Sequence, residues 1–216
     1  NSLSPSPSQG LLSVTENSFV NMTNVRLRNF GSGVSIPGRA IYSSEGSGYM
    51  RNVTFFNSTS AGLGLAMYLN ASTWYLEDVT FMNCSSSLPT FAGSIFSVDW
   101  DTITTKLTFA GKISFVNSLN NGVSSVMNFP QNTYVYSDSV KPSHFYFDGN
   151  KGMLIGFNLR GDPSQTIVEI GQITVVSHVP EPRFNNYLFY HSGNPVLLPT
   201  VVNVIGTSGI SSSDIG

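Results

Sequence analysis

The sequence contains few charged residues and a single cysteine. Only 10% of its 216 residues are charged, against roughly 25% in most soluble domains. The formal net charge is -2, and the scattered lysines and arginines form no basic stripe, which argues against nucleic acid or an anionic membrane as a partner. Because Cys84 is alone, an internal disulfide is impossible, and we interpret this thiol as a small core residue.

The sequence also lacks long apolar runs and recognisable catalytic or metal-binding motifs. No run approaches the 18 or more apolar residues of a membrane span. The three histidines, His144, His178 and His191, lie far apart without a metal-ligand spacing. Neither a phosphate-binding loop nor a nucleophile elbow occurs. We therefore predict no enzyme activity, no catalytic residue, no metal and no cofactor.

What the chain does contain is a repeat of about 30 residues. Its clearest copies share a V-T-F-x-N pattern, and looser copies follow toward the C-terminus. The intervals between first residues are 28, 26, 34, 32, 28 and 29. The copies are 25-VRLRN-29, 53-VTFFN-57, 79-VTFMN-83, 113-ISFVN-117, 145-FYFDG-149, 173-ITVVS-177 and 202-VNVIG-206.

Two further short apolar segments occur in most repeats, one after V-T-F-x-N and one before the next copy. Examples are 65-LAMYL-69 and 74-WYL-76, which are rich in β-branched or aromatic residues and flanked by Gly, Asn, Ser or Pro. Three short strands in each repeat describe one coil of a parallel β-helix. The sequence therefore predicts an all-β, parallel β-helix (solenoid) of about seven coils, with repeated units that are stable only when stacked.

Alternation along each V-T-F-x-N strand assigns its side chains to two faces. We expect Leu27, Phe55, Phe81 and Phe115 to form a column inside the solenoid. Asparagine ends each strand where the chain turns a corner, because Asn tolerates the left-handed conformation. We expect the stacked amides to form an inward-facing ladder at Asn29, Asn57, Asn83 and Asn117.

Five N-x-S/T sequons suggest an extracellular, N-glycosylated protein. Since the predicted ladder faces inward, Asn57 and Asn83 are the less favourable glycan sites. Asn21, Asn52 and Asn70 are the better candidates, and Asn52 is expected to point outward because it precedes the inward Val53.

Three apolar residues alternate out of phase with the core column. Phe56, Met82 and Val116 should therefore face outward as a stripe. Two interpretations stay open: a loop or corner covers the stripe, or it is a contact surface for another chain.

The V-x-F segment ending at Asn, followed by a Gly-containing apolar strand such as 64-GLAM-67 or 93-GSIF-96, resembles the repeats of the polymorphic outer-membrane protein type. Those repeats were first described in chlamydial surface proteins, and similar ones occur in secreted proteins of protists. The likeness covers roughly residues 20 to 130. It implies a right-handed β-helix with an adhesive or structural role at the cell surface.

Many parallel β-helices act on polysaccharides, and such enzymes need carboxylates converging on one outer sheet. The nearest local cluster is Asp99 and Asp101 with Lys106, which we interpret as a solvated turn between strands. The other acids do not recur in register from coil to coil. This pattern favours a structural protein over an enzyme.

The two ends of the sequence have no amphipathic helical pattern that could cap a β-helix. We predict a Ser/Pro-rich arm or linker over residues 1–12, the β-helix over 13–206 and a tail over 207–216. The resulting hypothesis is a secreted structural or adhesive glycoprotein. It would self-assemble through its ends into a surface filament or coat, or stack on neighbouring repeats of a larger chain. The alternatives are a carbohydrate-active β-helix enzyme, a glycan-binding module, or a fragment of a larger surface adhesin.

Overall fold

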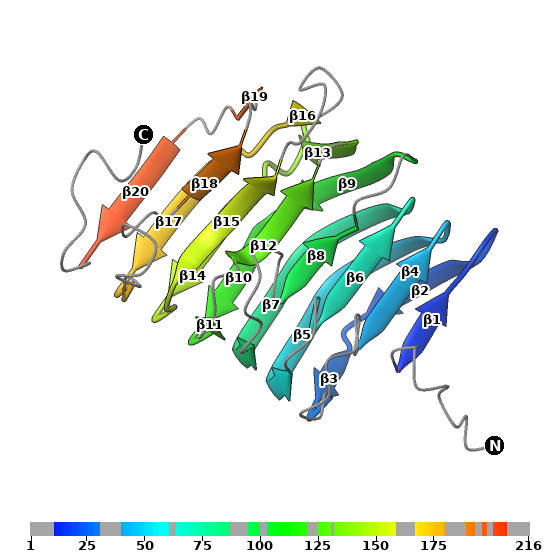
Figure 1. The fold of residues 1–216 in the computed structure, drawn as a ribbon, viewed down its shortest axis with the longest axis horizontal. Coiled ribbons are helices and arrows are strands. Elements are labelled where there is room, and N and C mark those ends of the chain that lie inside the picture. The colour runs from blue at the N-terminus through cyan, green and yellow to red at the C-terminus, as the bar shows by residue number, and fades with distance from the viewer. Residues whose placement is uncertain are drawn as a thin grey trace.

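The computed structural model describes residues 11–30, 40–60, 64–86, 95–99, 103–120, 125–130, 132–158, 167–179, 189–192, 196–197 and 201–206. Within these residues the chain is all-β, and its parallel strands are wound into a β-solenoid (Figure 1). The predicted fold class is therefore confirmed. Across the described ranges no helix is long and apolar enough to span a membrane.

The first of two sheets contains seven parallel strands, one from each sequence repeat. Their order in the sheet follows the chain, because each coil lies directly beside the next. The strands are β1 (Leu12–Val14), β4 (Ile41–Ser44), β6 (Met67–Asn70), β8 (Phe96–Val98), β12 (Ser125–Pro130), β15 (Met153–Asn158) and β18 (Phe189–Ser192).

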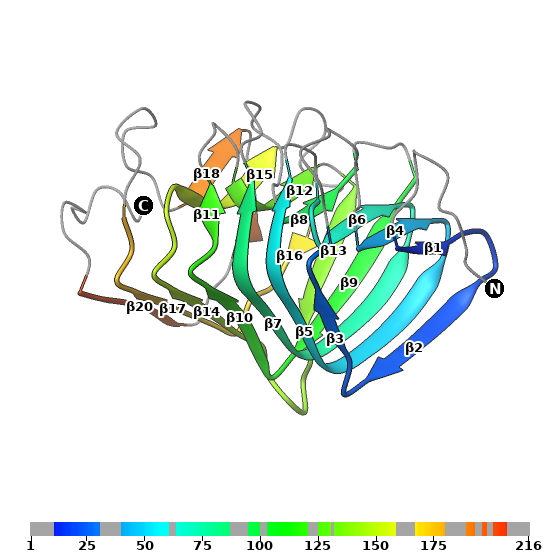
Figure 2. The same ribbon diagram turned by 90° about the horizontal axis from the view of Figure 1, so that it is seen from below.

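The second sheet bends into two limbs that meet at a corner (Figure 2). Two long strands, β5 (Ser47–Ser60) and β7 (Thr73–Ser86), run through both limbs, and β11 (Leu119–Asn120) pairs with the end of β7. Limb one also contains β2 (Phe19–Thr23), β9 (Thr105–Ala110), β13 (Thr133–Ser137), β16 (Ile167–Val168) and β19 (Val196–Leu197). Limb two also contains β3 (Arg26–Arg28), β10 (Lys112–Val116), β14 (His144–Asp148), β17 (Gln172–Val176) and β20 (Val201–Ile205).

Two details of the predicted coil are different. The chain winds about five turns of solenoid, fewer than the seven coils expected. Three short strands per coil occur where β8, β9 and β10 follow one another. In the two preceding coils, limb one and limb two share one continuous 14-residue strand.

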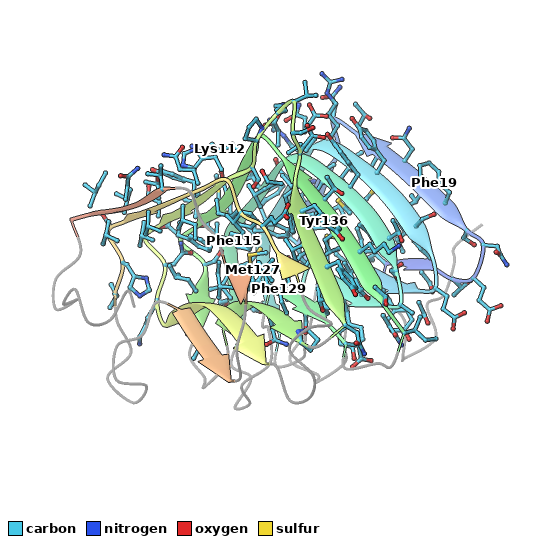
Figure 3. The ribbon with its side chains drawn as sticks, turned by 90° about the horizontal axis from the view of Figure 1, so that it is seen from above. Phe19, Lys112, Phe115, Met127, Phe129 and Tyr136 are labelled. Carbon is cyan, nitrogen blue, oxygen red and sulfur yellow. The ribbon has the colours of Figure 1, made fainter. Side chains whose placement is uncertain are left out.

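Limb two carries the predicted inner column, which extends beyond the expected residues. Leu27 pairs with Phe55, Phe55 with Phe81 and Phe81 with Phe115 in an unbroken register. Phe115 lies in the interior with Met127 and Phe129 of the first sheet, whereas Lys112 and Phe19 lie at the outside (Figure 3). The complete inner column is Leu27, Phe55, Phe81, Phe115, Phe147, Val175 and Val204.

The corner at the end of limb two explains the repeated asparagine. Each corner residue has a left-handed backbone, which Asn and Gly adopt with little strain. The φ angles are 55° at Asn29, 53° at Asn57, 52° at Asn83, 48° at Asn117, 62° at Gly149, 50° at Ser177 and 66° at Gly206. The predicted reason for the asparagines is confirmed.

The predicted direction of these asparagine side chains is wrong. Asn57 and Asn83 are exposed, because a left-handed residue interrupts the alternation of the strand and turns the next side chain inward. The inward positions belong instead to the following residues, such as Ser58, Cys84 and Ser118, which are 3%, 0% and 0% exposed. Cys84 is thus the core residue that the sequence predicts.

The middle strands of the first sheet are buried on both sides, whereas Tyr42 of β4 is partly exposed. Phe96 and Phe129 face the interior, while Ser97 and Asn128, which alternate with them, are 1% and 0% exposed. The outer faces of the two limbs are consequently the main free surfaces of the described molecule. Its strands extend from Leu12 to Ile205; residues 1–10 of the predicted arm and all of the predicted tail lie outside the described residues.

Candidate functional site

The sequons occupy different surroundings. Asn21, Asn52, Asn57 and Asn83 are all exposed. Asn70, expected to be a good glycan site, is only partly exposed, and its side-chain oxygen is buried without a partner among the described residues. The hydroxyl of its sequon, Ser72, is buried and lies 2.9 Å from the Ser43 hydroxyl. Exposure therefore favours the other four sequons as glycan sites, including Asn57 and Asn83, which the sequence analysis ranks as less favourable.

Part of the predicted asparagine ladder is present, on the outside. The Asn83 side-chain N–H donates to the Asn57 side-chain oxygen over 3.1 Å. A second rung lies at the corner between the limbs, where Asn52 donates to the Asn24 oxygen over 2.7 Å. These amide bonds connect neighbouring coils at exposed corners.

The predicted apolar stripe lies on the outer face of limb two. Phe56 pairs with Met82, and Met82 pairs with Val116, so the three are adjacent in successive coils. Met82 is 38% exposed, and the other two are partly buried. The outward direction of the stripe is confirmed; its role as a contact surface stays a prediction.

A group of charged and aromatic side chains that the sequence does not reveal lies at the corner between the limbs. We call it the corner cluster: Tyr49, Arg51, Tyr75, Glu77, Asp78, Asp138 and Lys141. Six strands, β8 to β13, separate β7 from Asp138 and Lys141 in the sequence, because these two residues come from the connection between β13 and β14. We call this connection, residues 138–143, the strap.

The strap passes over one coil to reach the coil before it. The Lys141 ammonium donates to the Glu77 carboxylate over 2.8 Å and also to the Asp78 carboxylate. Gly111, in the coil between, leaves room for this contact: an added Cβ would lie 2.3 Å from Oδ1 of Asp78 and 2.6 Å from Cε of Lys141, so both side chains would have to move. The φ of 61° at this position also favours glycine.

Tyrosine hydroxyls complete the corner cluster. Tyr49 donates to Glu77 over 2.9 Å, and Tyr75 donates to Asp138 over 3.1 Å. The two rings stack on the outer face of limb one with centroids 5.3 Å apart. Asp138 also accepts backbone N–H bonds from Val140 and Lys141, which fix the turn of the strap.

These contacts keep the carboxylates ionised. Hydrogen bonds from Lys141 and Tyr49 lower the pKa of Glu77. Desolvation raises the pKa of Asp78, but the bonds from Lys141 and the Lys112 backbone outweigh it, so the net shift is downward. The backbone N–H groups of the strap lower the pKa of Asp138.

The tyrosines shift the other way. Burial and the bond to Asp138 raise the pKa of Tyr75 to about 12, and the bond to Glu77 raises that of Tyr49. At neutral pH the phenols therefore stay protonated donors, and none of the three carboxylates is held protonated as a general acid would be. The hydrogen bonds and ion pairs of the corner cluster therefore connect neighbouring coils.

Replacing Gly111 with alanine is expected to lower the free energy of unfolding by about 2 kcal/mol, because a left-handed alanine is strained and its Cβ would displace the strap. Urea unfolding followed by circular dichroism measures the loss. Gly206→Ala is the control, since Gly206 has a φ of 66° but no atom within 4 Å of the added Cβ. Equal losses in the two variants would show that the strap does not matter.

The other cluster considered in the sequence contributes little to a site. Asp99 is partly buried, and its carboxylate is hydrogen-bonded to Tyr68, a contact that with burial raises the pKa of that phenol. Trp100 and Asp101 lie outside the described residues. Among the residues that the structure describes, no group of three or more His, Cys, Asp or Glu side chains could hold a metal ion.

Comparisons with known proteins add no identification. The resemblance to polymorphic outer-membrane protein repeats thus rests on the sequence pattern alone. No protein family matches the chain, and no significant similarity was found to a curated protein or to a solved structure.

Proposed function

We propose that this chain is a non-enzymatic structural or adhesive glycoprotein outside the cell, a building block of a surface filament or coat. The observation that carries the proposal is that the charged and tyrosine side chains of the corner cluster are engaged in contacts between coils. In the corner cluster, Lys141 and two tyrosines bond to the carboxylates of Glu77, Asp78 and Asp138, and these bonds join side chains from three coils. Side chains bonded to one another in this way stabilise the stacking of coils and are not free to bind a substrate.

The surface supports the same proposal. Four sequons are exposed, which leaves room for N-glycans, although the side-chain nitrogens of Asn52 and Asn83 also donate hydrogen bonds to neighbouring coils. Hydroxyls and amides compensate for the low charge. The end coils leave apolar side chains, such as those of Phe19 and Ile205, in contact with solvent. Surfaces of this kind commonly mark contacts between proteins. The proposed partners are further copies of the chain or neighbouring repeats of a larger chain.

Electron microscopy of the native, glycosylated material tests the proposal, together with an assay of polysaccharide cleavage. We expect regular filaments or sheets and no release of new sugar ends. Seven stacked strands at about 4.8 Å each imply an axial repeat of roughly 34 Å. Isolated short rods would favour the fragment of a larger adhesin, and polysaccharide cleavage would contradict a non-enzymatic role.

A glycan-binding module or carbohydrate-active enzyme is the second candidate, and one observation favours it. The stacked Tyr49 and Tyr75 share the outer face of limb one with Tyr134 and Tyr136, which also stack, with centroids 6.4 Å apart. Aromatic faces next to hydrogen-bonding groups suit the binding of sugar rings. Binding to a glycan array that is lost in Tyr134→Ala, but kept in Met82→Ala on the other limb, would support this candidate.

A further inference from the structure

We infer that the two ends of the solenoid pair with each other in successive copies of this chain, with β20 of one copy in register beside β3 of the next. The inference rests on the proposed structural role and adds to it the partner, the strands and the register. Its evidence lies in the interior side chains, the corner hydrogen bonds and the outer side chains of the two end coils.

The interior side chains are incompletely covered at both ends. In the middle of the solenoid, Phe55 and Phe81 of the inner column are 0% exposed. In the first coil Leu27 is only partly buried, and in the last coil Val204 is only partly buried. A second copy placed end to end would set its Leu27 on Val204, and the column would continue across the contact.

The corner hydrogen bonds have a constant direction that a second copy would continue. Each corner N–H donates to the carbonyl that precedes the corner of the next coil: Asn29 to Phe56 over 3.2 Å, Gly149 to Val176 over 3.0 Å and Ser177 to Ile205 over 3.1 Å. The next bond in this series runs from the N–H of Gly206 to the carbonyl of Arg28 in a second copy. Both corners already have the required left-handed backbone.

Each strand of the first coil has a counterpart in the last coil. β1 and β18 end the first sheet, β19 ends limb one opposite β2, and β20 ends limb two opposite β3, so the strand edges lie at opposite ends of the rod (Figure 1). Because all strands are parallel, stacking requires no reversal of direction. A head-to-tail contact of this type does not close, and it produces a filament.

The outer side chains are compatible with this register. Arg26 and Arg28 are exposed on β3, and the residues that would lie beside them, Asn203 and Ile205, are uncharged. Ile205 is 57% exposed, and the aliphatic stem of Arg28 would cover it. The contact thus places no like charges next to each other.

Disulfide crosslinking of the full chain tests the register. Arg26→Cys and Asn203→Cys in one chain would place two thiols on in-register neighbours about 4.8 Å apart between Cα atoms, within disulfide range. Under mild oxidation we expect a ladder of covalent multimers on non-reducing gels. Native Cys84 is buried, which raises the pKa of its thiol to about 12 and keeps it out of the reaction.

The matched control is Arg26→Cys with Ile205→Cys, which the inferred register separates by about 8 Å. We expect at least tenfold less multimer from this pair. Equal ladders from both pairs, or filaments in the microscope without a ladder from the first pair, would overturn the inferred register and leave the structural role standing. A chain that neither assembles nor crosslinks would overturn both.

A second variant separates the ends from the apolar stripe. Leu27→Asp is expected to reduce assembly at least tenfold, because it places a charge in the contact, while Met82→Asp on the stripe is expected to leave assembly unchanged. Circular dichroism confirms that each variant is folded. Loss of assembly in Met82→Asp but not in Leu27→Asp would show that the copies contact each other through the apolar stripe, and it would contradict the inference.

Discussion

Replacing Phe81 with alanine is expected to lower the free energy of unfolding by about 4 kcal/mol, a large part of the 5–15 kcal/mol of a typical domain. Phe81 is 0% exposed, and its ring stacks between Phe55 at 5.0 Å and Phe115 at 4.6 Å between centroids. The variant removes a central contact of the inner column, and coils are stable only through their neighbours. Urea unfolding followed by circular dichroism measures the loss.

Met82→Ala is the matched control for this experiment. Met82 follows Phe81 on the same strand but faces outward and is 38% exposed. Its truncation is expected to change the free energy of unfolding by less than about 1 kcal/mol. If the two variants were destabilised equally, the inner column could not be the main source of stability in limb two.

Lowering the pH from 7 to 5 is expected to destabilise the coil that contains His178 by about 2 kcal/mol. His178 is 3% exposed, and neither ring nitrogen has a partner among the described residues. Burial lowers its pKa from 6.5 to about 4. Above pH 6.5 the ring is neutral in both states; between 6.5 and 4 only the unfolded chain takes up the proton, so stability falls as the pH falls.

The test compares the pH dependence of unfolding in the unmodified chain and in His178→Asn. Asn150 occupies the equivalent position one coil earlier, so asparagine suits the site and does not titrate. The loss between pH 7 and 5 should be much smaller in the variant. The carboxylates of Glu77, Asp78 and Asp138 have lowered pKa values, so the stability that they contribute is lost progressively only below about pH 5.

His144 requires a separate control. Its pKa is lowered by burial and by Lys112, in the same direction as that of His178, although its ring is 3.0 Å from the Thr174 hydroxyl. His144→Gln measures its share of the pH dependence. A pH effect that is unchanged in His178→Asn and absent in His144→Gln would contradict the assignment to His178.

The sequence predicts the inner column well because every V-T-F-x-N copy carries the same alternation. The alternation places Phe55, Phe81 and Phe115 on the same face of successive strands, which is the interior face. Their pairing in the structure confirms the predicted register between coils. The left-handed corners were also predictable, because Asn recurs where each strand ends. The direction of the corner asparagine side chains was not predictable, because a single left-handed residue reverses the alternation on which that prediction depends.

The corner cluster could not be found from local spacing. Lys141 lies 63 residues after Asp78 and 64 after Glu77 in the sequence. One signal for it exists in the repeat lengths. The interval from Ile113 to Phe145 is 32 residues, longer than most, and the extra residues form the strap. Length alone does not locate the strap, because the longest interval, 34 residues from Val79 to Ile113, has only Gly111 between β9 and β10.

The strap also determines how the rod would respond to a pulling force. Backbone bonds between coils point along the axis, so tension applied at the ends would peel β20 and then β17 away singly, each at low force. Peeling is expected to need more force at β14, because Lys141 and Asp138 are bonded to β7 across the coil that contains Gly111. Three coils would then be loaded together, which makes the middle of the rod more resistant than its C-terminal end.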